Sequence, residues 1–236
     1  MAKSSAKAAR GSGRRRTAAR AGRGLRLPWL PIIVVAGIAG VVGLVAFLFL
    51  QARSSSGSDE AAIAAEADAS PALPGEFVDL PEIYGGPYSE TGGHVRRAID
   101  YAAEGNSNPP AGGPHWSGNC GDDPSAAPAF CGPAPWGVFR EEWDAATLVH
   151  NMEHGGVVLW YNTTDQDLIG ELEALVTKRL EDGELLVMAP YPEMEEGHIA
   201  LTSWSRIDKF PVADYSPERV ETFIDTHLRR FNPEDF

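Results

Sequence analysis

Cysteine is scarce in this chain: the 236 residues contain only Cys120 and Cys131. No C-x-x-C pair is present, which disfavours a metal site built from cysteine. The sequence also lacks an internal repeat, a phosphate-binding glycine loop, a nucleophile elbow and a readable Ser/His/Asp order. These absences leave no support for a repeat protein, a P-loop nucleotide-binding enzyme or a serine hydrolase.

Acidic residues are missing from the first 26 positions, which carry nine lysines and arginines. The rest of the chain reverses this balance, with 11 basic and 33 acidic side chains. An acidic surface repels phosphate groups, so we expect no nucleic-acid partner. Residues 1–27 are interpreted as a basic cytoplasmic arm, because positive charge beside a membrane span is what orients the span.

Charged side chains are absent from Ile32 to Leu50 as well. A helix of this length spans roughly 28 Å, close to the thickness of a bilayer's hydrocarbon core. We predict a transmembrane helix over residues 28–50, which makes the protein a single-pass protein of the cell membrane. A cleaved signal peptide is the alternative, but its apolar region is shorter and ends in an A-x-A-like site, whereas "LQARSSS" follows here. The positive-inside rule then places the C-terminal part outside the cytoplasm.

Residues 51–75 are small, polar and without periodicity, which predicts a flexible linker. The two cysteines beyond it flank the loop "CGDDPSAAPAFC". In an oxidising compartment a Cys120–Cys131 disulfide is expected, worth about 3 kcal/mol through loop closure.

Residues 76–236 predict a small extracytoplasmic α+β domain with a mixed sheet, two or three packed helices and a long Gly/Pro-rich loop region. The loop region covers residues 77–140, with one short helix over 95–103. Strands are predicted at 156–161, 184–190 and 198–204. A helix starting near Thr163 and ending at Gly183 makes the first two strands parallel, and a hairpin across "YPEMEEG" joins the last two. A final helix begins with Ser216 as its cap.

The stretch "EEWDAATLVHNMEHGG" contains two histidines, which are potential metal ligands. Its pattern predicts a helix from about Glu141 to Glu153. His150, Glu153 and His154 fall on one side of that helix. Two imidazoles one turn apart are a frequent metal-ligand geometry, and H-x-x-E-H is also the inverted zinc-peptidase motif. His115, in "PPAGGPHW", is the expected third ligand, and His94, in "GGHV", is a possible additional one.

Three interpretations of these histidines follow. In the first, His115, His150 and His154 bind Cu or Zn with Glu153 as a supporting carboxylate. The second is a metal-dependent hydrolase with Glu153 as general base, although Gly155 ends the helix earlier than such enzymes require. The third is a metal-free interaction module in which the histidines only brace the fold. No protein partner is indicated.

Several motifs occur together and in order: "NPPAGGPHW", "WGVF", "LVHNMEHGGVVLWY", "VMAPYP" and "ALTSW". With them, about residues 90–233 resemble a bacterial membrane-anchored family catalogued as domain of unknown function 3105. The family's usual wording has serine where Gly112 stands, tyrosine at Phe139 and leucine at Met152. The histidines and the glutamate of the motif are retained. The resemblance implies an architecture and a motif but no reaction.

Overall fold

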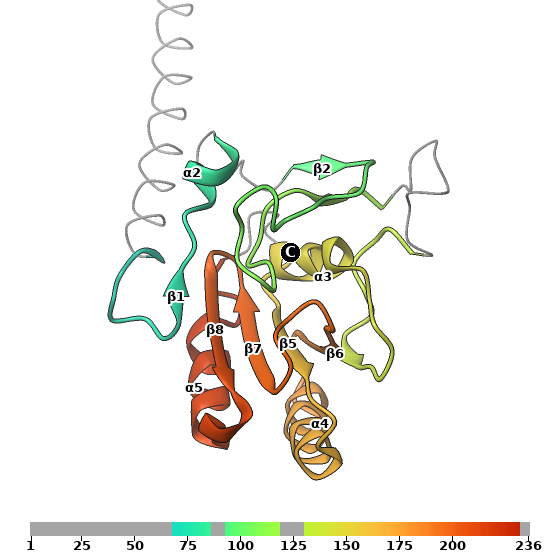
Figure 1. Ribbon diagram of the computed structural model, residues 1–236, viewed down its shortest axis with the longest axis vertical. Coiled ribbons are helices and arrows are strands. Elements are labelled where there is room, and N and C mark those ends of the chain that lie inside the picture. The colour runs from blue at the N-terminus through green and yellow to red at the C-terminus, as the bar shows by residue number, and fades with distance from the viewer. Residues whose placement is uncertain (1–67, 86–92, 119–129, 232–236) are drawn as a thin grey trace, which may run out of the picture. The chain divides into compact units, whose positions relative to one another are not determined.

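The computed structural model describes residues 68–85, 93–118 and 130–231 of the chain (Figure 1). These residues form an α+β fold with a mixed sheet, as predicted, and with four α-helices rather than two or three. The helices are α2 (Leu80–Tyr84), α3 (Ala145–Glu153), α4 (Gln166–Glu181) and α5 (Pro217–His227). The strands of the main sheet are β1 (Glu76–Phe77), β4 (Gly137–Val138), β5 (Val157–Asn162), β6 (Leu186–Pro190), β7 (His198–Ser203) and β8 (Arg206–Pro211). A separate pair consists of β2 (His94–Val95) and β3 (His115–Trp116).

The main sheet has the order β1-β8-β7-β5-β6-β4. Strands β5 and β6 are parallel, with Val158 opposite Val187, so the predicted crossover through α4 is confirmed. The predicted hairpin between the second and third strands is wrong. Strand β7 instead pairs antiparallel with β5, on the side of β5 that does not face β6. The chain then turns at Ser205, which has a φ of 64°, into strand β8, which was not predicted.

The two faces of this sheet are covered differently. Val157, Leu159 and Tyr161 of β5 pack into a core with side chains of α4 and α5. The alternate residues Val158 and Trp160 pack into a second core with α3 and the Gly/Pro-rich segments. Both faces are therefore buried, which explains why β5 reads as a continuous apolar run. Figure 1 shows α3 and β2 at a distance from α4 and α5.

Helix starts follow the local capping residues. Ser216 accepts a hydrogen bond from the Arg219 backbone N–H, which confirms the predicted cap of α5. Helix α4 begins later than predicted, because Asp165 rather than Thr163 is its cap. Helix α3 begins at Ala145 and not near residue 141. The helix predicted over 95–103 is wrong, since this segment starts as strand β2 and continues in turns.

The start of the described chain is held against α5 by buried polar contacts. The Nε2–H of His227 donates to the Pro74 carbonyl at 2.9 Å, and the Nε–H of Arg230 donates to His227 Nδ1 at 2.9 Å. Arg206, 1% exposed, donates to the Gly75 carbonyl at 2.9 Å. Both ring nitrogens of His227 are thus engaged in its neutral form.

Several predicted features lie outside the described residues. These are the basic arm (1–27), the transmembrane helix (28–50), most of the linker (51–75) and Cys120. Among the residues that are described, no helix has the length and apolarity needed to cross a bilayer. Cys131 is buried, and its disulfide with Cys120 stays a prediction.

Candidate metal centre

Helix α3 is fixed at its start by one carboxylate. Asp144 caps the helix by accepting a hydrogen bond from the Thr147 backbone N–H at 3.2 Å. The same side-chain oxygen accepts from the indole N–H of Trp116 at 2.9 Å. Because Trp116 follows His115 in strand β3, this shared oxygen ties the histidine-bearing strand to the helix.

The middle and the end of α3 are equally constrained. The Asn151 side chain, fully buried, forms two 2.8 Å hydrogen bonds with the backbone of Ala134, one as acceptor and one as donor. Gly155 follows the helix with a φ of 80°, which favours glycine. At Gly156 a Cβ would lie 2.5 Å from the Trp136 ring. The helix therefore stops directly after the H-x-x-E-H motif, at a fixed position against the sheet.

His94 and His115 reach the same place through the parallel pair of β2 and β3, in which they are direct register partners. Their ring centroids are 4.9 Å apart and their planes nearly perpendicular, at 82°. His115 is fully buried, whereas the side chain of His94 is 41% exposed. The pairing joins segments 21 positions apart in the sequence and delivers two imidazoles to the end of α3.

The imidazoles converge on one oxygen of Glu153. His115 Nε2 lies 2.8 Å and His94 Nε2 lies 3.4 Å from Glu153 Oε2. The ring of His150 completes the group, with its centroid 4.8 Å from that of His115 and 5.3 Å from that of His94. Each of these four side chains has one potential metal-ligand atom, and these four atoms all lie within 4.8 Å of one another. We call His94, His115, His150 and Glu153 the four-residue group.

The hydrogen bonds of His115 define its protonation. Its Nδ1 faces the Gly113 carbonyl at 2.9 Å, and a carbonyl can only accept, so Nδ1 carries a proton. In a neutral ring Nε2 is then an acceptor, facing a carboxylate oxygen that also only accepts. The 2.8 Å contact therefore requires either a proton shared between Nε2 and Oε2 or a cation bound between the two groups.

Charges within the four-residue group influence one another. Burial raises the pKa of Glu153, but the hydrogen bond from His115 and the neighbouring imidazoles outweigh it, so the pKa lies below its usual value of 4.5. Burial, aided by repulsion from His115, lowers the pKa of His150 to about 4. At neutral pH the group thus combines an ionised carboxylate with an uncharged imidazole, the forms in which both act as ligands.

Two of the distances in the group lie near the spacing of a transition-metal site. With metal–ligand bonds of about 2.0–2.1 Å, the ligand atoms of a tetrahedral site lie about 3.3 Å apart. The His94–Glu153 separation of 3.4 Å matches this spacing, and the His115–Glu153 contact of 2.8 Å would have to widen. In addition, the Nδ1 of His150 is buried without a hydrogen-bond partner among the described residues. The group thus has two facing acceptors that need a proton or a cation, and one buried nitrogen without a hydrogen-bond partner among the described residues.

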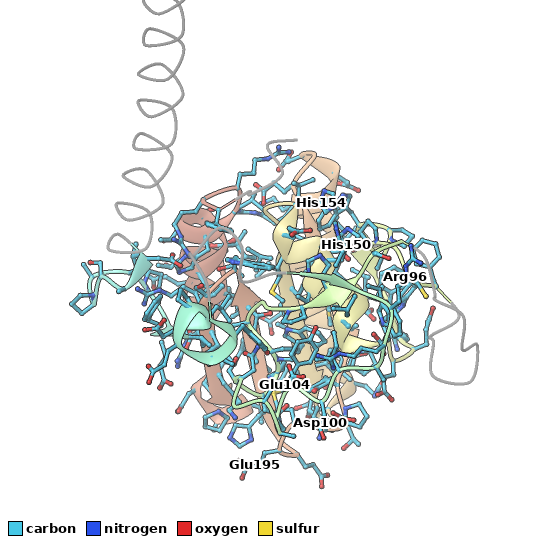
Figure 2. The ribbon with its side chains drawn as sticks, turned by 90° about the horizontal axis from the view of Figure 1, so that it is seen from above. Arg96, Asp100, Glu104, His150, His154 and Glu195 are labelled. Carbon is cyan, nitrogen blue, oxygen red and sulfur yellow. The ribbon has the colours of Figure 1, made fainter. Side chains whose placement is uncertain are left out.

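The remaining predicted residue, His154, lies beside the four-residue group but not in it. It caps the C-terminus of α3 and lies close to His150 (Figure 2). Its ring stacks on that of His150 with centroids 5.0 Å apart and planes at 24°. The structure therefore brings His115, His150 and Glu153 together as expected and adds His94 as a full member. Glu153 contacts two imidazoles directly, which is closer than a supporting role implies.

Comparison with known proteins adds one match. A family described as "Protein of unknown function (DUF3105)" matches residues 94–235, a stretch that begins at His94 and includes the whole four-residue group. Neither the curated proteins nor the solved structures contain a match to this chain.

Proposed function

This chain belongs to the family of proteins of unknown function called DUF3105, and we propose that it binds one transition-metal ion, Zn or Cu, through His94, His115, His150 and Glu153. The observation that carries the proposal is the convergence of two imidazole nitrogens on Glu153 Oε2 beside a third, buried imidazole. A cation at this point would bind both His115 Nε2 and Glu153 Oε2, two acceptors that otherwise face each other.

Three further features support metal binding. The Gly113 carbonyl accepts a hydrogen bond from His115 Nδ1, the ring nitrogen that does not face Glu153. Such a hydrogen bond orients metal-ligating histidines and fixes their tautomer. The group lies at the C-terminal end of α3, where the helix dipole favours a cation. His94 is its one exposed member, which gives an ion a route from solvent.

The donor types limit the metal. Three imidazoles and a carboxylate suit Zn(II) and Cu(II), whereas Cu(I) prefers sulfur ligands. Met152 is fully buried in the apolar core, and the four-residue group found among the described residues contains no sulfur. We therefore place Zn(II) and Cu(II) ahead of Cu(I).

The hydrolase alternative receives less support. In the H-x-x-E-H mechanism both motif histidines would bind the metal and the glutamate would stay free to activate water. Here Glu153 contacts His115 at 2.8 Å and belongs to the four-residue group, whereas His154 does not. Glu153 is better placed as a ligand than as a general base. The membrane anchor and the extracytoplasmic position remain part of the proposal and rest on residues 1–50.

Elemental analysis of the full chain, purified without a histidine tag, tests the metal. We expect close to one Zn or Cu per chain, in the purified protein or after reconstitution. The His115→Asn/His150→Asn double variant should lose it. His198→Asn is the matched control, because His198 lies in β7 and pairs with Glu195, outside the four-residue group.

Two outcomes would count against the proposal. Absence of metal from the wild-type chain after reconstitution with both ions would favour the metal-free module, in which a protonated His115 pairs with Glu153. Equal metal content in the double variant, verified as folded by circular dichroism, would place the ion elsewhere.

A further inference from the structure

A cavity of about 400 Å³ lies at the opposite end of α3 from the four-residue group. In Figure 2, Asp100, one of its lining residues, lies well away from His150 and His154. Its walls come from residues 99–102, 107–108, 142–146, Tyr191 and Glu193. The volume falls in the range of small-molecule sites, roughly 300–1,000 Å³.

Three aromatic side chains belong to the lining of this cavity. Tyr101 and Tyr191 are only 6% and 5% exposed, and Trp143 is half-buried. Tyr191 is held in place by Trp160, with ring centroids 5.0 Å apart. The indole N–H of Trp143 is buried and has no hydrogen-bond partner among the described residues. The cavity therefore has fixed aromatic side chains among its walls.

The charged side chains that line this cavity are all acidic. Asp100, Glu142, Asp144 and Glu193 all line the cavity, all four are exposed, and no lysine, arginine or histidine is among the lining residues. Their effect reaches Tyr191: burial, and then Glu193 and the other carboxylates, raise the pKa of its phenol. The Tyr191 O–H donates to Glu193 at 3.1 Å. The cavity thus has a negative potential.

A bare metal ion does not suit this arrangement. Metal ligands must bring their oxygens within a few ångströms of one point. Among the described residues, the four carboxylates of the cavity do not form such a cluster; the four-residue group at the other end of α3 does. Carboxylates spaced around aromatic walls instead suit a larger cation with apolar parts.

We propose that this cavity binds a small organic cation, an alkylammonium or guanidinium group. The aromatic rings would contact its apolar stem and its charged face, and the carboxylates would accept its hydrogen bonds. A free amine and a basic side chain of a peptide share this chemistry. The proposal stands independently of metal binding, because its lining includes none of the four-residue group.

Calorimetric titration of the full chain with butylguanidine, butylamine and the peptide Gly-Arg-Gly tests this assignment. Butylurea is the uncharged control, since it matches butylguanidine in size and shape. Glu193→Gln removes one charge of the lining and leaves an acceptor for Tyr191. Glu195→Gln is the matched control variant, because Glu195 is equally exposed and lies outside the lining.

We expect one cation per chain, no binding of butylurea, and a Kd about tenfold weaker in Glu193→Gln than in wild type or Glu195→Gln. Tighter binding of butylguanidine or butylamine than of Gly-Arg-Gly identifies a small free organic cation, and tighter binding of Gly-Arg-Gly identifies a basic peptide. Equal binding of butylurea, or no binding of any probe up to about 10 mM, overturns the proposal. So does an unchanged Kd in both Glu193→Gln and Glu142→Gln, a second variant at an exposed lining residue.

Discussion

Replacing Glu153 by glutamine separates a metal ligand from a bracing residue. Its side chain is 7% exposed and accepts from a fully buried His115, so glutamine keeps the shape and loses the charge. Without metal, the variant loses a charge-assisted hydrogen bond, which costs about 1.5–3 kcal/mol. With metal it also loses an ionised ligand. The two effects differ in their dependence on metal concentration.

The metal-dependent part has a calculable size. At a free ion concentration of 100 times the Kd, binding stabilises the folded state by about 2.7 kcal/mol. Loss of an outer partner already weakens metal sites by about 10- to 100-fold, so we take 100-fold as a minimum for a direct ligand. At the same ion concentration the variant then gains only about 0.4 kcal/mol. For a domain of this size, the Zn-induced rise in Tm should drop from about 5–10 °C to about 1 °C.

Differential scanning fluorimetry with and without Zn measures both parts. The chelated proteins give the cost of the lost charge, and the rise on adding Zn gives the ligand contribution. His198→Asn should retain the full rise, because His198 lies outside the four-residue group. A Glu153→Gln variant that is destabilised in chelator but shows the wild-type Zn response would refute the assignment of Glu153 as a ligand.

Three further perturbations test the scaffold. Burial lowers the pKa of His227 to about 4, below the ordinary 6.5. As the pH falls from 6.5 to 4, the unfolded chain therefore binds a proton before the folded chain does, and the free energy of unfolding decreases by up to about 3 kcal/mol. We expect His227→Gln to reduce this decrease, as measured by urea titrations at pH 7 and 5. We expect Gly113→Ala to lower the free energy of unfolding by more than about 1 kcal/mol, because Gly113 has a φ of 107° and a Cβ there would lie 2.5 Å from the Tyr84 ring. A thermal melt measures this loss. Asn151→Ala removes both hydrogen bonds to Ala134 and should cost about 2–4 kcal/mol in urea unfolding, with metal affinity reduced as well. A loss below 0.5 kcal/mol in either of the last two would contradict the described packing.

Periodicity predicted the elements whose contacts are local. The unit β5–α4–β6 follows from a buried apolar run, an amphipathic helix and a second run, and the chirality of the crossover makes its strands parallel. Strand β8 was missed because Lys209 and Asp208 interrupt its apolar pattern on the partly exposed face. The predicted hairpin between β6 and β7 was wrong for a similar reason. Strand β7 pairs with β5 instead, and the sequence of a strand does not show its partner or its register.

The Gly/Pro-rich region resisted prediction because its order comes from distant contacts. The apolar spacing of 95–103 suggests a helix, but His94 and Val95 pair with residues 115 and 116 instead. Tyr101 then donates to the Pro114 carbonyl at 2.5 Å, which fixes the chain beside His115. Gly112 belongs to the same packing, because a Cβ there would lie 2.6 Å from Leu80 Cδ1. Its φ of 130° and this close approach both favour glycine at that position in this chain.

The ligand set shows the limit of a helical projection. The projection places His154 one turn from His150, so the two rings share a side of α3, and the structure agrees. Sharing a side does not make two nitrogens converge: the His154 ring stacks on His150 with planes at 24°, yet His154 lies outside the four-residue group. Convergence comes from a different segment, where β2 sets His94 at 82° to His115. We therefore expect His94→Asn to weaken Zn binding more than His154→Asn does, and the reverse order in a Zn titration would restore the motif's own pair as the ligands.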